Sequence, residues 1–209
     1  MSKISLEPNA SGAGTFTLAA PNSNTNRTLN LPDESGILFS DGSGVPGSAV
    51  TGQLASSNMP AGSVIQVVQT YKTNTFTRTA TSEDDIPGMS VDITPSSASS
   101  KIMVMVTLNW SSDGSSNVWI NLKRGSTYLG RGTGGSRDNG FYSSNVGATD
   151  NRIVTPTNIN YLDSPSTTST INYRIVVQSD NDNLFTVNTR AINSFYGSSS
   201  HITAMEIAG

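Results

Sequence analysis

Three glycines near the middle of the chain have the spacing of a dinucleotide-binding motif. Gly130, Gly132 and Gly135 match G-x-G-x-x-G, in which backbone N–H groups at the start of a helix hold a pyrophosphate. That chemistry needs a helix directly after the last glycine. Here the chain continues as a polar stretch, SRDNG at 136–140. The sequence therefore predicts a flexible, exposed loop at 130–140, and we expect no cofactor.

Acidic residues could hold a cation at two other places. Asp180 and Asp182 alternate with asparagines, as oxygen ligands do in a calcium loop, but the glycine and the glutamate of the calcium-hand pattern are missing. Residues 83–85 are three acids in a row. Polar turns account for both runs, so we predict no metal site. Whether the Asp180/Asp182 turn binds an ion stays open.

Catalytic chemistry has little support in the residue types. The chain has no cysteine, and its one histidine is His201, near which nothing resembles a G-x-S-x-G nucleophile elbow. The lack of cysteine excludes disulfides and thiol catalysis. A glycosidase would need two carboxylates across a cleft, whereas the acids here lie mostly in turn-like runs. We predict no catalytic residue and expect that the protein is not an enzyme.

Arginines and aromatic residues gather in or beside the loop at 130–140. Guanidinium forks and aromatic faces are common in sites that recognise sugars or carboxylates. A solubilising loop is the alternative. The predicted receptor- or ligand-binding residues are Arg124, Arg131, Arg137, Phe141, Tyr142 and Arg152.

We expect β-strands to hold this loop. Residues 101–124 read as two strands, and we interpret the turn at Asp113-Gly114 between them as a hairpin. In the first strand the even-numbered residues 102–110 are all apolar, and the opposite face begins with Met103 and Met105. Strand side chains alternate between faces, so something must cover each face. The face that begins with Met103 and Met105 is covered either by another sheet or by another subunit.

Composition agrees with an all-β fold. Hydrophobic residues make up 34% of the 209 residues and charged residues 13%. We expect eight to ten short strands after residue 63. Residues Ile86–Met89 are predicted to form a turn between two of them. This favours a β-sandwich, jelly-roll-like, without a helix of three turns. The net charge of −3 gives no basic footprint for nucleic acid. No segment is apolar enough to span a bilayer, so we expect no membrane insertion.

The chain divides by composition into three parts. Residues 1–40 are predicted to form an extended, β-rich anchor or stalk, 41–62 a Gly/Ser/Pro-rich linker, and 63–209 the C-terminal sandwich head. The first part holds only three short apolar bursts, so one copy cannot bury enough surface to offset its chain entropy. We expect it to be ordered only against other copies or a partner.

The order of these features resembles bacteriophage tail-fibre and appendage proteins. The resemblance lies in GTFTLAAP and RTLNLPDESGILF near the start, then in GSVIQVVQ, KIMVMVTLNW, NVWINLKRGSTYLG and the terminal HITAMEIAG. It implies a non-enzymatic virion protein, located on the tail, neck or capsid. It also implies a homotrimer whose head is similar in plan to the tumour-necrosis-factor fold. Met103 and Met105 would then lie at the trimer interface.

The partners that this resemblance implies are other copies of the chain, virion proteins that bind residues 1–40, and a host-surface glycan or protein. Capsid decoration, as a head fibre, is a variant of the same interpretation. The alternative from another class is a bacterial carbohydrate-binding or carbohydrate-active protein that shares only the sandwich. A free lectin of that kind would not explain residues 1–61.

Overall fold

The computed structural model describes residues 11–14, 24, 26, 58–113, 116–134, 139–146 and 153–209. By its contacts the chain divides into two units, 1–51 and 52–209. The predicted stalk and linker lie almost wholly outside the described residues, and so do Arg137 and Arg152. The second unit contains the predicted head.

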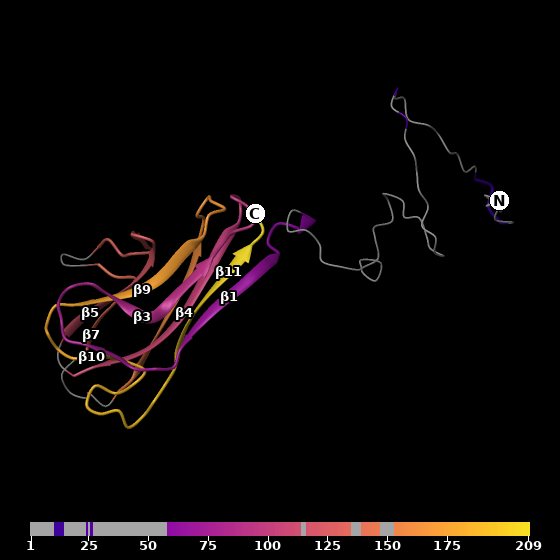
Figure 1. Ribbon diagram of the computed structural model, residues 1–209. Coiled ribbons are helices and arrows are strands. Elements are labelled where there is room, and N and C mark those ends of the chain that lie inside the picture. The colour runs from indigo at the N-terminus through magenta and orange to yellow at the C-terminus, as the bar shows by residue number, and fades with distance from the viewer. Residues whose placement is uncertain are drawn as a thin grey trace. The chain divides into compact units, whose positions relative to one another are not determined.

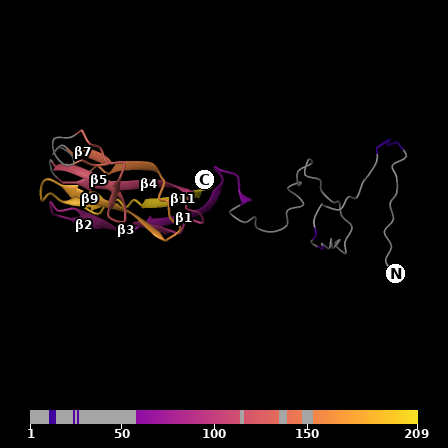
Figure 2. The same ribbon diagram turned by 90° about the horizontal axis from the view of Figure 1, so that it is seen from above.

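The head is a sandwich of two antiparallel sheets (Figures 1 and 2). The first sheet contains β1 (Val64–Lys72), β2 (Phe76–Arg78), β4 (Lys101–Ser112), β8 (Thr155–Asp163), β10 (Phe185–Val187) and β11 (Ser200–Ile207). The second sheet contains β3 (Asp84–Ile93), β5 (Ser116–Arg124), β6 (Thr127–Leu129), β7 (Tyr142–Val146) and β9 (Ile171–Ser179). The described residues contain no α-helix.

The strand order is that of a jelly roll. β4 pairs with β8 along one edge and with β11 and then β10 along the other, while β1 pairs with β11 and β2 with β10. The first sheet therefore has four positions, β1/β2, β11/β10, β4 and β8. In the second sheet β3 pairs with β9, β9 with β5, and β5 with β7 and β6. The predicted all-β, jelly-roll-like head is confirmed.

The hairpin predicted at Asp113-Gly114 is wrong. β4 belongs to the first sheet and β5 to the second, and the two strands do not pair. Both strands have one wholly apolar face, and these faces pack against each other across the sandwich, where Leu108, Ile120 and Leu122 are fully buried. Facing sheets bury both apolar faces at once, whereas a hairpin would have put both strands side by side in one sheet.

The turn predicted at Ile86–Met89 is also wrong, because this segment lies inside β3. The ladder between β3 and β9 is irregular between Asp85 and Ser90, and Gly88 has a φ of 80°. A bulge of this kind kinks a strand without ending it. As a result Ile86 and Met89 both reach the core, with 2% and 0% of their surface exposed.

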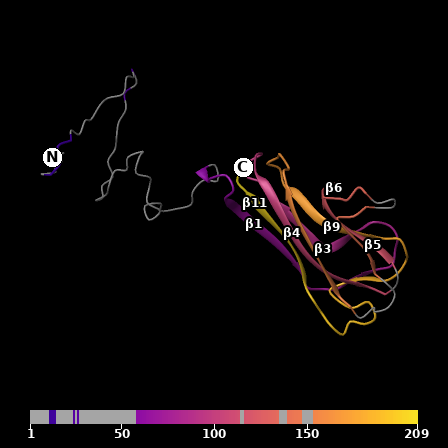
Figure 3. The same ribbon diagram turned by 180° about the vertical axis from the view of Figure 1, so that it is seen from behind.

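The chain enters and leaves the head at the same end. The Gly62 N–H donates to the Ala208 carbonyl at 2.8 Å, and the Ala208 N–H donates to the Ser63 carbonyl at 2.8 Å. Figure 3 shows the start of β1 beside the end of β11. We call this the linker end of the sandwich. The opposite end, where β4 finishes and β8 begins, is the far end.

Candidate functional site

Arg124, the first of the predicted ligand-binding residues, is held in an ion pair inside the head. Its Nη1 donates to both carboxylate oxygens of Asp163, at 2.8 and 3.1 Å, and Asp163 is 5% exposed. The Tyr173 hydroxyl donates to the same carboxylate at 2.7 Å. Burial raises the pKa of Tyr173, and the bond to Asp163 raises it further. Arg124 thus joins β5 to β8, and through the shared Asp163 to β9, and its charge is paired with a protein carboxylate.

The aromatic residues beside the predicted loop pack inward. The Tyr142 ring meets Trp110 edge-on at a centroid distance of 6.2 Å, and Phe141 meets Tyr161 in the same way at 6.3 Å. Both rings are half-buried against the core. The Arg131 guanidinium lies 4.4 Å from the centre of the Tyr128 ring. The described members of the predicted set thus each contact other protein groups, and the full predicted site stays a prediction.

The acid run at 83–85 is paired with basic residues of neighbouring segments. Glu83 accepts from Lys123 Nζ at 2.8 Å and from the Tyr128 hydroxyl at 2.5 Å. Asp84 and Asp85 lie 3.3 and 2.8 Å from arginine nitrogens, those of Arg78 and Arg174 respectively. In the second acid run, Asp180 accepts from the Asn117 N–H at 2.9 Å. Within the described ranges, no three His, Asp or Glu side chains are grouped so that they could hold a metal ion.

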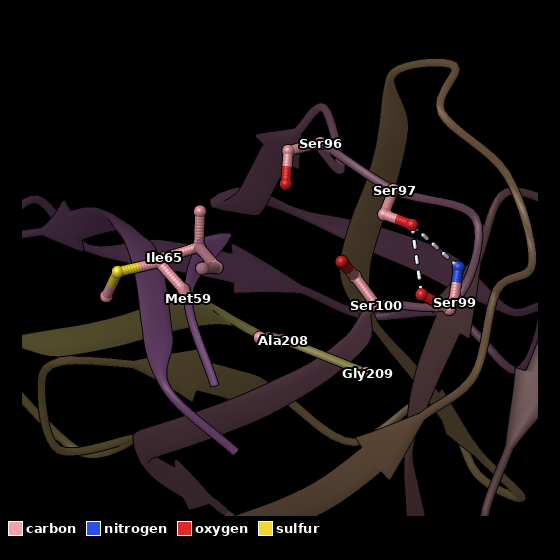
Figure 4. A pocket seen from close by; sticks show the side chains of 8 residues that line it. All are labelled: Met59, Ile65, Ser96, Ser97, Ser99, Ser100, Ala208 and Gly209. Atoms are coloured by element: carbon pink, nitrogen blue, oxygen red, sulfur yellow. Dashed lines mark hydrogen bonds between the residues drawn. The ribbon is translucent and has the colours of Figure 1, made fainter. Parts of the chain in front are cut away.

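A pocket of about 350 Å³ opens at the linker end of the head (Figure 4). It is lined by Met59, Ile65, Ser96, Ser97, Ser99, Ser100, Ala208 and Gly209. Ser96 and Ser100 also donate to the carboxylate of Glu206, at 2.6 and 2.7 Å. Gln66 Nε2 donates to the other carboxylate oxygen at 2.6 Å, and Glu206 is fully buried. A buried carboxylate with neutral donors ties the β3–β4 connection to β1 and β11.

The pKa of Glu206 makes this network sensitive to acid. Burial raises that pKa, but the hydrogen bonds from Ser96, Gln66 and Ser100 outweigh burial and hold it below 4.5, its ordinary value. A carboxyl whose pKa is lower in the folded state stabilises the fold fully above its unfolded pKa. That contribution is lost as the pH falls through the folded pKa.

We therefore expect Glu206→Gln to destabilise the head most at neutral pH and least in acid. Urea unfolding of both proteins between about pH 7 and pH 3 should show the wild-type advantage shrinking as the pH falls. Asp182→Asn, which removes an exposed carboxylate, is the control and should cost less than about 0.5 kcal/mol. A wild-type advantage that stays constant over this range would contradict the assignment.

The outer face of the first sheet is open and apolar near the linker end. Val67, Met205, Met103 and Leu162 are directly opposite one another on β1, β11, β4 and β8. They form one row across the sheet, which we call the apolar row. Val67 is 55% exposed and Leu162 47%, and the two methionines between them are half-buried. Met105 lies in the next row, between Thr203 and Asn160.

This face also lacks charge. From the apolar row to Asn109 its described residues include no Asp, Glu, Lys or Arg, and Lys101 lies at its edge. Its other members are Gln69, Tyr71, Thr107, Pro156, Asn158 and His201. The outer face of the second sheet differs, because it carries ion pairs such as Arg174–Asp85 and Lys123–Glu83. Few charges around exposed apolar groups are typical of the centre of a protein interface.

One exposed group was missed by the sequence reasoning. Phe195 and Tyr196 lie in the segment between β10 and β11 and are 80% and 62% exposed. The run NSFYGSSS at 193–200 was the available signal, because two aromatics flanked only by small polar residues cannot be buried by alternation.

Comparisons with known proteins give no family. No protein-family model matches the chain, and no curated protein matches it. Solved structures of infectious bursal disease virus are similar over part of their length. The Gx strain structure gives a TM-score of 0.36 at 10% identity, over 70% of this chain and 43% of that one. The Gt strain structure gives 0.37 at 11% identity, over 77% and 43%.

A third structure, the VP2 subviral particle of the same virus, gives a TM-score of 0.31 at 12% identity, over 69% of this chain and 38% of that one. The chain spans less than half the length of these proteins. TM-scores this low assign no role to this chain.

Among the described residues, none form a helix with the length and hydropathy of a membrane span.

Proposed function

We propose that this chain is a non-enzymatic structural protein of a bacteriophage virion. It assembles as a homotrimeric fibre or spike, its first 40 residues anchor it to other virion proteins, and its jelly-roll head contacts the host surface or a virion partner. The sequence resemblance to phage appendage proteins supports this proposal. The observation that carries the assembly is the uncharged outer face of the first sheet.

The apolar row explains why that face would be covered. Val67, Met205, Met103 and Leu162 project from four neighbouring strands into one continuous strip. Removing a side chain of this size from water contributes about 1.5–3 kcal/mol. The polar residues beyond the row are amides and hydroxyls, which can pair across an interface without an unpaired charge being buried.

A second copy of the chain is the occupant that fits the whole molecule. Copies meeting through this face would bring their linker ends together, since the apolar row lies close to the linker end. Their leading segments would then start side by side, and three copies of residues 1–40 could bury surface that one copy cannot. Three weak heads on one shaft would also gain avidity for a repeated surface ligand.

The oligomeric state tests the proposal. Light scattering of the full chain is expected to give the mass of three chains for the wild type. Met103→Glu puts a carboxylate into the centre of the apolar row, and Met105→Glu puts one into the next row. Both variants should give single chains or aggregates. Thr127→Glu adds the same charge at an exposed position on β6 of the other sheet and should leave the trimer intact.

The possible results test the trimer and its proposed interface separately. A trimer that persists in both methionine variants would contradict the interface, and a wild-type protein with the mass of one chain would contradict the assembly. Antibody labelling of particles with the head as antigen tests the location. Label at the tail or neck supports a fibre or spike, and label over the shell supports capsid decoration. No label on particles would favour the bacterial carbohydrate-binding alternative.

A further inference from the structure

β10 and β11 pair with consecutive parts of β4, and the segment between them is an insertion. Val187 of β10 is opposite Trp110 of β4, and His201 of β11 is opposite Thr107. The two positions are thus three residues apart on β4 but fourteen residues apart in the partner. The extra residues, 189–199, must leave the sheet. We call them the inserted loop, and Figure 1 shows this part of the chain at the far end of the head, away from the C-terminus.

The base of the inserted loop is fixed by Asn188, which is fully buried and has a φ of 63°. Its Nδ2 donates to the carbonyls of Lys72 and Asn74, at 2.7 and 3.1 Å. Its carbonyl accepts from the Ser198 N–H at 2.9 Å, and its Oδ1 accepts from the Ser200 hydroxyl at 2.6 Å. Both ends of the loop are therefore held by one residue, through its backbone carbonyl and its side chain, and the loop is pre-organised.

The loop lies on the outer side of the first sheet. The Ala191 N–H donates to Ser111 Oγ at 3.3 Å, and Ser111 follows Trp110 on β4, so its side chain points away from the core. Ser111 is only 2% exposed because the loop covers it. Beyond this contact the loop turns outward and exposes its two aromatic rings.

The two rings form an open platform. The ring centres of Phe195 and Tyr196 are 5.9 Å apart with an angle of 57° between the planes, and both rings are mostly exposed. The Arg190 guanidinium lies 4.4 Å from the centre of the Tyr196 ring. A cation over a ring face attracts the ring, so Arg190 favours this position of the Tyr196 ring although the ring lies outside the core.

Arg190 has no acidic partner in the described part of the chain. Arg78, Arg124 and Arg174 each lie within 3.3 Å of a carboxylate oxygen, whereas the described ion pairs include none to Arg190. Residues 188–199 contain no acid, and the Arg190 Nε is buried, so a ligand would have to bind the two terminal nitrogens of the guanidinium. A guanidinium can bind a carboxylate with two parallel hydrogen bonds, so the platform adjoins an unused carboxylate-binding group.

We propose that Phe195, Tyr196 and Arg190 form a binding site for a carboxylated saccharide. The C–H faces of a sugar ring stack on the two aromatic rings, and its carboxylate pairs with the guanidinium. The neighbouring asparagine and serines supply partners for sugar hydroxyls. This site deepens the attachment role proposed above by naming the ligand class, and it rests on that role. Unlike Phe141 and Tyr142, which pack inward beside the loop at 130–140, these two rings are exposed.

The test uses the full chain on an array of oligosaccharides that carry uronic or sialic acids, each beside its carboxyl-reduced counterpart. The wild type should bind at least one acidic member at least about tenfold more tightly than its reduced counterpart, since a hydrogen bond to a charged group contributes about 1.5–3 kcal/mol. Arg190→Gln should abolish that preference. Phe195→Ala should weaken binding of both forms, because it removes the stacking surface.

Lys101→Gln is the matched control. It removes the same charge from an exposed position at the linker end and should leave binding unchanged. Thermal unfolding of each variant checks that the head is folded, which is expected because Phe195 is 80% exposed.

Three results would overturn the site. They are no binding to any carboxylated member, equal binding of acidic and reduced forms, and binding that Phe195→Ala leaves intact. Loss of the trimer in Phe195→Ala would instead assign the platform to contacts between copies and would also overturn it. If binding fails while the wild type is a trimer, only the ligand site falls. If the wild type is a single chain, the assembly fails whatever the array shows.

Discussion

Replacing Trp110 with alanine is expected to lower the free energy of unfolding by about 3–5 kcal/mol. The Trp110 ring is fully buried and stacks on Phe185 at a centroid distance of 5.4 Å. Its Nε1 donates to the Thr157 hydroxyl at 2.9 Å. Alanine leaves a cavity between the sheets and leaves the buried Thr157 hydroxyl without its donor, and both effects destabilise the head.

Urea unfolding followed by circular dichroism measures this loss. Trp110→Phe separates the two contributions, because it keeps a ring and removes the indole donor, and it should cost about 1–3 kcal/mol. Tyr196→Ala removes an exposed ring and should change stability by less than about 0.5 kcal/mol. Equal losses for Trp110→Ala and Tyr196→Ala would show that Trp110 is not in the core.

Asp163→Ala is expected to cost about 3–5 kcal/mol, the usual loss when one partner of a buried ion pair is removed. The Asp163 carboxylate is 5% exposed and accepts from both Arg124 and Tyr173. Alanine leaves a guanidinium and a buried hydroxyl without their acceptor. Three strands in two sheets meet at this carboxylate, so its loss weakens the connection between the sheets.

Asp85→Ala is the matched control, because Asp85 forms an ion pair of similar length with Arg174 but its side chain is 60% exposed. Solvent screens such a pair, and its loss should cost less than about 1 kcal/mol. The double variant Arg124→Met with Asp163→Leu should be more stable than Asp163→Ala, since it leaves no charge unpaired. Equal destabilisation by Asp85→Ala and Asp163→Ala would contradict the buried network.

For the candidate sites, residue type and sequence neighbourhood did not predict which side chains are exposed. Arg124, Phe141 and Tyr142 are residue types that ligand sites use, and their sequence neighbourhood is polar, so the pattern favoured a binding loop. The structure places the two rings against the core and the guanidinium against Asp163. Conversely, Phe195 and Tyr196 look like core residues by type, but an insertion held by Asn188 places them outside. Residue type alone does not give exposure, because exposure depends on what packs nearby.

The all-β class, most strand positions and the two-faced character of β4 can be predicted from the amino-acid sequence, because alternation of side chains is a property of each strand alone. Three features required the fold: β4 and β5 lie in different sheets, Ile86–Met89 continues β3, and Glu206 is buried beneath serines. These features depend on pairing between segments distant in sequence. The side chains of one strand indicate which of its faces must be buried, but they do not identify the segment that covers that face.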